Sequence, residues 1–424
     1  MNSERKEVII VHPPSKMLER QKMVPPLGPL QLAADLEEGG HTVKVIDVGE
    51  EGLDIKEVME TQFLAVSATT PQYYEAKELC RQVLKERYRK GLKYPQIAIG
   101  GAHATYMGSM LLEDGWDFVV TMEGDSLINP LVEEKITPGF IVGDTLHDLN
   151  SLPLPAYHLV DLMEYRRDAK HKPTAPVMAS KGCPHDCSFC SNELWNRKMR
   201  FYDPEYVVNV VNRIKGMGIN QVVFYDDDAL INYQDRIQAI SRGLEPLSVT
   251  WRCNTHVNTI DNEKSRQVGV LGMVKDAGCR HISLGIDGAD DEALQFFGKA
   301  TSLARCKRAI EMVKKAGIFV KTFLIYIPGR GMSYAEKITS LIKETDPDFV
   351  QVSSLIPMPG SDMYDHPERY DLHFDKEKLD SYYYVGKQEV TGDVGMLTEN
   401  DRQVLDYLHA WIVDWRRSKP EMPL

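Results

Sequence analysis

Short apolar runs alternate with helical stretches along most of the chain, and this alternation constrains its fold more than any other feature. Within the first 143 residues, the runs expected to form strands lie at 7–12, 42–48, 63–69, 96–100 and 117–121. Helical patterns lie between or after them, near 27–38, 73–89, 109–113 and 127–134. Nearly continuously apolar strands separated by helices indicate a parallel sheet covered on both faces. We therefore expect residues 1–143 to form a doubly wound parallel sheet of the Rossmann-like kind.

The alternation resumes at residue 177. Predicted strands lie at 177–181, 221–225, 249–253, 281–286, 319–327 and 349–355. Predicted helices lie at 204–215, 233–244, 263–277, 303–316 and 333–344. Six consecutive β–α units predict a parallel barrel, partial or full, and we assign a partial (β/α)6 barrel to residues 177–365.

Two segments break the alternation. Residues 144–176 contain four prolines and a cluster of charges, which is typical of a linker between domains. Residues 366–424 are expected to form a small α-helical C-terminal tail with aromatic residues at Tyr382–Tyr384. Its helix, predicted at 400–417, begins where Thr398 and Asp401 have the spacing of a capping pair.

Composition excludes several classes of protein. The formal net charge of −12 argues against a nucleic-acid-binding surface, which would need a clustered basic face. No apolar run approaches the roughly 20 residues that span a bilayer, and the start lacks a signal-peptide core. The chain has seven cysteines, which is an odd number. Three of them form one tight cluster and the others are scattered, which does not resemble a disulfide framework. We therefore expect a cytoplasmic protein without a membrane span.

The tight cluster consists of Cys183, Cys187 and Cys190, directly after the first predicted barrel strand. Gly182 and Pro184 favour a loop that lets the three thiolates converge. Such a loop could hold an iron–sulfur cluster with one iron left open for a substrate or cofactor. A structural zinc site with His185 or a distant cysteine as fourth ligand is an alternative, as are three buried free thiols. The position at the carboxyl end of a barrel strand, where barrel active sites lie, favours the catalytic cluster.

The CxxxCxxC run after the first strand of a β/α barrel resembles the radical S-adenosylmethionine (SAM) superfamily. The resemblance implies a [4Fe–4S] cluster held by the three cysteines and SAM chelated by the open iron. It further implies reductive cleavage of SAM to methionine and a 5′-deoxyadenosyl radical, which abstracts hydrogen from a substrate carbon. The residues that the resemblance places against SAM are Phe189, Asp227, Gly285, Asp287, Pro328 and Gly329.

Each of these motifs also has a structural interpretation. Phe189 could be a core residue, and the run Asp226–Asp228 could be a solvated loop with helix-capping character. The run from Gly285 to Ala289 departs from the family's Gly-Ile-Glu-Ser-Gly, since Asp replaces Glu, Gly replaces Ser and Ala replaces Gly. The run from Pro357 to Ser361 resembles the family's Pro-x-Pro-Gly-Thr. The scattered thiols of the barrel, Cys253, Cys279 and Cys306, are expected to be core or semi-buried residues.

The first domain resembles the cobalamin-binding domain that precedes the barrel in a large radical SAM subgroup. The matching runs include Gly39 to Val43, Ser67 to Thr70, Gly100 to Thr105 and Glu123 to Asp125. The resemblance implies cobalamin contacts from Ser67, Thr69, Gly100, Gly101, His103, Glu123 and Gly124. The Asp-x-His-x-x-Gly run that supplies a histidine to cobalt elsewhere is missing, and His12 is followed by two prolines. A domain that keeps the fold and binds nothing is the alternative.

The sequence therefore predicts a cobalamin-dependent radical SAM methyltransferase acting on an unactivated carbon of a small molecule. The rivals are a radical SAM dehydratase, cyclase or epimerase without cobalamin, and a non-enzymatic metal-binding scaffold. An electron donor such as flavodoxin or ferredoxin is expected as a partner. Candidate substrate contacts, taken to lie at strand tips, are Arg252, Asn254, Gln351 and Ser354, with His256 and Tyr382–Tyr384 as further candidates.

Overall fold

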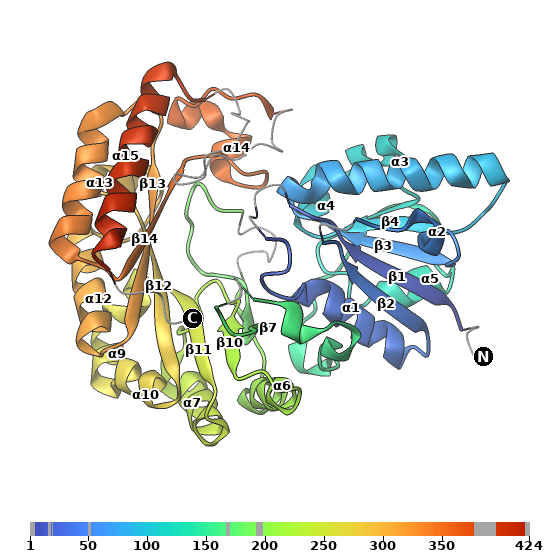
Figure 1. Cartoon of the computed structure of the whole chain (residues 1–424), viewed down its shortest axis with the longest axis horizontal. Helices are drawn as coiled ribbons and strands as arrows, with labels where there is room; N and C mark the ends of the chain where they lie inside the picture. The colour runs from blue at the N-terminus through green and yellow to red at the C-terminus, as the bar shows by residue number, and fades with distance from the viewer. Residues whose placement is uncertain are drawn as a thin grey trace. The chain divides into compact units, whose positions relative to one another are not determined.

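The structure is a computed structural model that describes residues 5–15, 18, 20–49, 52–166, 170–191, 198–376 and 396–419. The chain divides into two compact units, residues 1–175 and 176–424 (Figure 1). Each unit contains its own six-stranded sheet.

The first unit is built on a parallel sheet with strand order β2-β1-β3-β4-β5-β6. The strands are β1 (Glu7–His12), β2 (Thr42–Asp47), β3 (Phe63–Ser67), β4 (Gln96–Gly100), β5 (Phe118–Thr121) and β6 (Gly139–Val142). The order reverses between β1 and β3, which makes the unit doubly wound, as predicted. Ligands of such sheets bind beyond the carboxyl ends of the strands, near this reversal.

The edge strand β6 is not predicted from the sequence. It has only four residues, follows Pro138, and leaves Phe140 and Val142 43% and 64% exposed. Its apolar run, Phe140 to Val142, has only three residues and is shorter than the ranges that are predicted to form strands.

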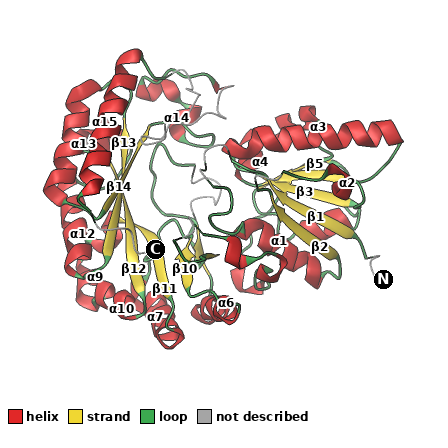
Figure 2. Ribbon diagram, viewed as in Figure 1, coloured by secondary structure: helices red, strands yellow, loops and turns green. Residues whose placement is uncertain are grey.

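Helices cover both faces of this sheet (Figure 2). They are α1 (Leu27–Glu38), α2 (Ile55–Val58), α3 (Tyr73–Lys90), α4 (Ala102–Met107) and α5 (Ile128–Val132). Ile9 and Val11 of β1 share one core cluster with Ala76 and Val83 of α3. Ile10 points to the other face, the side of α1 and α5. This alternation follows from the two-residue repeat of a strand.

The second unit is a partial barrel, as predicted. Its sheet has the order β14-β13-β12-β11-β10-β7, so β14 and β7 form the two edges. The strands are β7 (Ala175–Val177), β10 (Gln221–Phe224), β11 (Thr250–His256), β12 (Cys279–Asp287), β13 (Phe319–Tyr326) and β14 (Phe349–Ser354). Strands β10 to β14 pair in parallel.

The first predicted strand of the barrel, 177–181, is divided in the structure. β7 ends at Val177, and β8 (Ser180–Lys181) instead pairs antiparallel with β9 (Arg200–Phe201). The buried carboxylate of Asp226 accepts hydrogen bonds from Ala179 N (3.1 Å) and Ser180 Oγ (2.5 Å). These bonds hold the chain at the point where it leaves the sheet.

Helices alternate with the strands of this unit (Figure 1). They are α6 (Pro204–Gly216), α7 (Gln238–Leu244), α8 (Val257–Ile260), α9 (Glu263–Val268), α10 (Val270–Asp276), α11 (Asp291–Phe296), α12 (Leu303–Lys315), α13 (Gly331–Thr345) and α14 (Asp362–Asp365). The last helix, α15 (Glu399–Arg417), packs beside α13 and starts with the predicted capping box of Thr398 and Asp401. Tyr382–Tyr384 lie outside the described residues.

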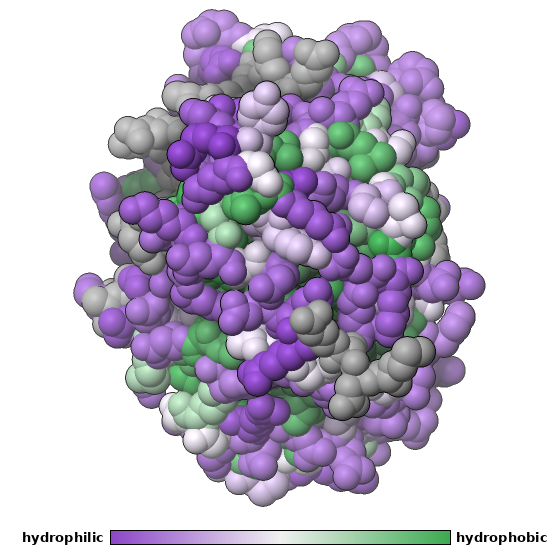
Figure 3. All heavy atoms as spheres, turned by 90° about the vertical axis from the view of Figure 1, so that its right-hand side faces the viewer, coloured by the Kyte–Doolittle hydropathy of each residue, from purple (hydrophilic) through white to green (hydrophobic). Residues whose placement is uncertain are grey.

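The surface and the helices give no sign of a membrane segment among the described residues. No helix there is long and apolar enough to cross a bilayer. On the face drawn in Figure 3, hydrophilic side chains predominate and hydrophobic ones gather in several separate groups.

Candidate cluster-binding and cofactor-binding sites

The three cysteines lie on the loop that follows β8. Gly182 at the start of this loop has φ +93°, a left-handed conformation that glycine adopts without strain. Cys183 and Cys187 are partly buried, Cys190 is exposed, and none forms a disulfide. The loop therefore carries three thiols that are available to a metal centre.

Two other loops of the barrel hold the cysteine loop in place. Ser188 donates from N to Phe297 O (3.0 Å) and from Oγ to Phe296 O (3.1 Å). On the other side, Met363 N donates to Ser188 O (3.0 Å). Ser191 Oγ donates to Pro359 O at 2.7 Å, which ties the loop to the run that resembles Pro-x-Pro-Gly-Thr.

Close backbone approach makes one of these contacts possible. A Cβ at Gly298, where φ is +64°, would lie 2.9 Å from Asp186 O. The ring of Phe189 meets that of Phe297 edge to face, with centroids 5.2 Å apart. Phe189 thus packs against the segment after β12.

The electrostatic surroundings of the thiols fit a metal cluster. Burial raises the pKa of the Cys183 thiol to about 12, and the charges of Asp228 and Asp227 add to the rise. Desolvation raises the pKa of the Cys190 thiol to about 12, and the negative charges of Cys187 and Asp227 add to the rise. The raised pKa values favour protonated thiols in the absence of metal. Cationic iron would reverse this, because a metal deprotonates the thiols that coordinate it.

The candidate ligands of a single zinc ion are not gathered in the part of the chain that the structure describes. Among the residues that the structure describes, no three His, Cys, Asp or Glu side chains converge as ligands of one ion. The ring of His185, the candidate fourth zinc ligand, stacks on His256 with centroids 3.6 Å apart. An iron–sulfur cluster spreads its thiolate ligands over different irons and does not need such convergence.

The acidic run after β10 separates into three different roles. Asp226 is 1% exposed and binds Ala179 and Ser180, as described above. Asp228 is 0% exposed and accepts hydrogen bonds from Thr255 Oγ1, Thr259 Oγ1 and His256 N at 2.5, 2.7 and 3.1 Å.

Asp227 is the exposed member of the run. Desolvation and its two acidic neighbours raise the pKa of this carboxyl to about 6. The negative charge of Asp227 also raises the pKa of the Cys183 and Cys190 thiols. Asp227 is therefore the carboxylate of this run whose exposure lets it meet a ligand.

A buried ion pair between Asp287 and Lys299 lies at the end of β12. The sequence predicts a role for Asp287 but does not point to Lys299. Lys299 Nζ donates to Asp287 Oδ2 (2.5 Å) and to Gly285 O (2.6 Å). Asp287 has φ +65°, which is uncommon for a residue with a side chain. The positive charge of Lys299 lowers the pKa of the Cys187 thiol, against the rise caused by burial. No sequence signal marks Lys299, because it follows the strand by twelve residues.

The loop after β13 contains the predicted SAM contacts Pro328 and Gly329. Gly329 N donates to Asp401 Oδ1 (2.8 Å), and Tyr326 OH donates to the same oxygen (2.7 Å). Asp401 is 0% exposed. The C-terminal helix thereby holds this loop, a contact that the capping pattern of Asp401 does not reveal.

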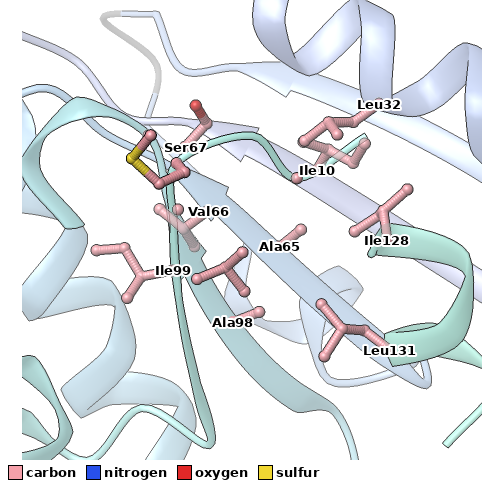
Figure 4. A pocket seen from close by; sticks show the side chains of 14 residues that line it. Ile10, Leu32, Ala65, Val66, Ser67, Ala98, Ile99, Ile128 and Leu131 are labelled. Carbon is pink, nitrogen blue, oxygen red and sulfur yellow. The ribbon is translucent and has the colours of Figure 1, made fainter. Parts of the chain in front are cut away.

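The first unit contains an open, apolar hollow at the carboxyl ends of its central strands (Figure 4). Leu32, Ile128 and Leu131 line one side, over the strands that carry Ala65 and Ala98. Small side chains on the strands and glycines at their ends leave this space free. An apolar hollow at this edge of a doubly wound sheet is a candidate site for the apolar part of a cofactor.

The structure places four of the seven predicted cobalamin contacts on this hollow, namely Ser67, Gly100, Gly101 and Gly124. Glycine is required at position 101, where φ is +92° and a Cβ would lie 2.9 Å from Ala68 O.

The other three predicted contacts do not line the hollow. Thr69 caps a short helix with Gln72, and Glu123 Oε2 accepts from Leu146 N (2.7 Å). His103 is 5% exposed and stacks on Tyr73 with ring centroids 4.0 Å apart. Burial lowers the pKa of His103 to about 4, so this imidazole is neutral.

His12 has partners at both ring nitrogens. Nδ1 lies 2.7 Å from Asp47 Oδ1, and Nε2 lies 2.8 Å from Gln72 Nε2. This arrangement leaves neither nitrogen directed toward the hollow.

The predicted substrate contacts lie on two faces of the barrel sheet. β11 extends to His256, so Arg252 lies in the first half of the strand and not at its tip. Strand pairing places Arg252, Asn254 and Gln351 on one face. Ser354 lies on the other face with a 5% exposed side chain, and the structure does not bring it together with them.

A doubly wound unit with an apolar hollow, followed by a partial barrel with a cysteine loop, defines a two-domain α/β enzyme that uses cofactors. The radical SAM superfamily model matches residues 177–342, and the B12 binding domain model matches residues 17–131. The chain therefore contains a radical SAM domain preceded by a B12-binding domain.

Similar proteins align with most of this chain. An uncharacterized methyltransferase of Pyrococcus horikoshii is 25% identical over 85% of this chain and 83% of its own. An anaerobic magnesium-protoporphyrin IX monomethyl ester cyclase of Cereibacter sphaeroides is 27% identical over 84% of this chain, which spans 63% of the cyclase. The radical SAM methyltransferase TsrM of Kitasatospora setae, solved with cobalamin and a [4Fe–4S] cluster, has a TM-score of 0.64 at 16% identity. The match covers 85% of this chain and 77% of TsrM, and it shows a shared fold.

Proposed function

We propose that this protein is a cobalamin-dependent radical SAM methyltransferase that adds a methyl group to an unactivated carbon of a small molecule. The observation that carries the proposal is the cysteine loop, held between two barrel loops in a chain that also has a B12-binding domain. Relatives named as methyltransferases support methyl transfer as the reaction.

In this proposal, Cys183, Cys187 and Cys190 hold a [4Fe–4S] cluster. When bound, the cluster supplies the electron that cleaves SAM, and cobalamin supplies the methyl group. Asp227 accepts a hydrogen bond from the SAM amino group, and Phe189 and the loop at Pro328 and Gly329 pack against the adenosine part.

Gly285 and Asp287 complete the proposed SAM site, and the ion pair with Lys299 positions them. Ser67, Gly100, Gly101 and Gly124, which line the hollow, would hold cobalamin. Thr69, His103 and Glu123 would act through the backbone they support. We further propose a cytoplasmic location and a flavodoxin or ferredoxin as electron donor.

Reconstitution without oxygen tests the proposal. The purified chain would be loaded with iron and sulfide, incubated with hydroxocobalamin and desalted, and its iron, sulfide and cobalamin counted per chain. We expect four irons and nearly one cobalamin, as in the family. A four-iron protein that retains no cobalamin would contradict methyl transfer.

The cyclase relative gives a second candidate, a radical SAM reaction without methyl transfer. SAM carrying a deuterated methyl group separates the two candidates. Deuterium in the product supports methylation, whereas a product without added carbon supports the second candidate.

A further inference from the structure

One face of the barrel sheet, called the open face below, carries exposed and partly exposed side chains among buried ones, whereas the other face is packed. On β11, Trp251 and Cys253 are 3% and 1% exposed, whereas Arg252 is partly exposed and Asn254 is exposed. On β13, the same alternation leaves Lys321 partly exposed. On β12 the same face carries His281 and Ser283, which are 2% and 6% exposed, so the accessible part of this face lies around Arg252, Asn254 and Lys321.

This open face leads toward the cysteine loop. Strand pairing places Gly285, whose carbonyl binds Lys299, on the same face as Lys321 and Asn254. The positive charge of the buried Lys299 in turn lowers the pKa of the Cys187 thiol. A molecule on the open face would lie below the proposed cluster and SAM.

The open face carries positive charge at its middle and lower levels. Burial, together with the charges of Arg252 and Lys321, lowers the pKa of His281 to about 3, so both cations lie near this ring. On the inward positions of β10 to β14, all within the described residues, the only acidic residue is Asp287, which binds Lys299. This positive interior contrasts with the net charge of −12 of the whole chain.

Aromatic rings flank one of the two cations. Lys321 Nζ lies 4.4 Å from the ring centroid of Phe323 and 5.4 Å from that of Phe349. The same nitrogen donates to Gln351 Oε1 at 2.8 Å. The rings restrict the lysine side chain and add apolar surface beside its charge.

We propose that the substrate carries an anionic group, a carboxylate or a phosphate, that Arg252 and Lys321 bind on this face while an apolar part packs on Phe323. The inference rests on the proposed function, since it takes the barrel interior as the substrate site. Arginine binds either anion with two parallel hydrogen bonds, and lysine adds a point charge.

The levels of the two cations also bound the length of the substrate. Lys321 and Arg252 lie two and four residues below the level of Gly285 and His256. A strand rises by about 3.3 Å per residue, so the anion would lie roughly 7 to 13 Å along the strands from the proposed SAM contact at Gly285.

Binding of simple probes to the reconstituted full chain tests this inference. Benzoate and phenyl phosphate carry the two anions on one ring, and benzamide is the uncharged counterpart. Dissociation constants would be measured by ligand-observed NMR for the wild type and for Arg252→Gln combined with Lys321→Gln. We expect the double variant to bind the anions at least about tenfold more weakly, because charge-assisted hydrogen bonds are lost.

The control is Arg280→Gln combined with Lys315→Gln, which removes the same charge from two exposed positions. We expect it to bind like the wild type, and Arg252→Lys to keep most of the affinity. Tighter binding of benzoate would assign a carboxylate, and tighter binding of phenyl phosphate a phosphate. Failure of both anions to bind the wild type, equal binding to the double variant, or equal binding of benzamide would overturn the inference.

Cleavage of SAM to 5′-deoxyadenosine in the same samples separates this inference from the proposed function. If the wild type cleaves SAM but does not bind the anions, the substrate class is wrong and the proposed function stands. If the loaded wild type cleaves no SAM, the proposed function fails whether or not the anions bind.

Discussion

At the scale of single residues, side chains of the same type have different roles because they lie at different positions in the fold. The seven cysteines are an example, because Cys80, Cys253, Cys279 and Cys306 are buried, whereas the three loop cysteines are not. The three carboxylates after β10 are another. Two of them stabilise the chain through hydrogen bonds, and Asp227 remains exposed.

We expect Cys187→Ala to lose the cluster, because two thiolates cannot replace three cluster ligands. Iron per chain should fall to near zero, and 5′-deoxyadenosine should no longer form. The matched control is Cys306→Ala, which removes a buried thiol from α12 and should keep iron at the wild-type level. Undiminished 5′-deoxyadenosine formation by Cys187→Ala would refute the cluster assignment.

Asp227→Asn should mainly weaken SAM binding, whereas Asp228→Asn should mainly lower the stability of the fold. Asp227→Asn removes one charge-assisted hydrogen bond to SAM, so its dissociation constant should rise by about tenfold with little change in thermal unfolding. Asp228→Asn disturbs three internal hydrogen bonds and should lower stability by about 1–3 kcal/mol. Equilibrium dialysis of SAM and calorimetry would measure the two effects, and identical results for both variants would contradict the division of roles.

At the scale of elements, the barrel depends on contacts that the alternation of strands and helices does not show. α15 follows the barrel strands in sequence, yet its first turn reaches β13 and the loop after it. The helix is therefore part of the barrel's support and not an appendage.

Asp401→Ala should destabilise the barrel unit by about 3 kcal/mol, because a buried carboxylate with bonds to Thr398, Tyr326 and Gly329 disappears. SAM affinity should fall as well, since Gly329 loses its anchor. Asp406→Ala, which changes an exposed residue of the same helix, is the control and should leave both quantities unchanged. Urea denaturation followed by tryptophan fluorescence would measure the difference, and equal midpoints for the two variants would contradict the support role.

At the scale of the whole molecule, the two units offer separate sites with separate chemistry. The hollow lies within the first unit and the cysteine loop within the second. Each site is built on its own sheet, so a change in one should leave the other loaded.

Ser67→Phe should block cobalamin binding, because a ring at the mouth of the hollow fills the space for the cofactor. Retained cobalamin should fall at least about tenfold, whereas iron and sulfide should stay at the wild-type level. Ser67→Ala is the matched control and should retain cobalamin. Loss of iron in Ser67→Phe would show that the two sites do not load independently.

The sequence by itself determined the two α/β sheets, the capping box of the last helix and the clustering of three cysteines. These features follow from local patterns: the apolar repeat of strands and helices, the spacing of a cap and the spacing of the thiols. The edge strand β6 and the division of the first barrel strand lack such a pattern. The first has too few apolar residues, and the second depends on the distant carboxylate of Asp226.

Only the tertiary structure decided which residues meet. It pairs Lys299 with Asp287, directs Ser354 away from Gln351, and leaves His103 under a tyrosine ring instead of on the hollow. The physical reason is that burial and strand register depend on contacts between residues far apart in the chain. A sequence pattern records which residues are apolar or charged, and the packing of the sheets decides which of them face one another.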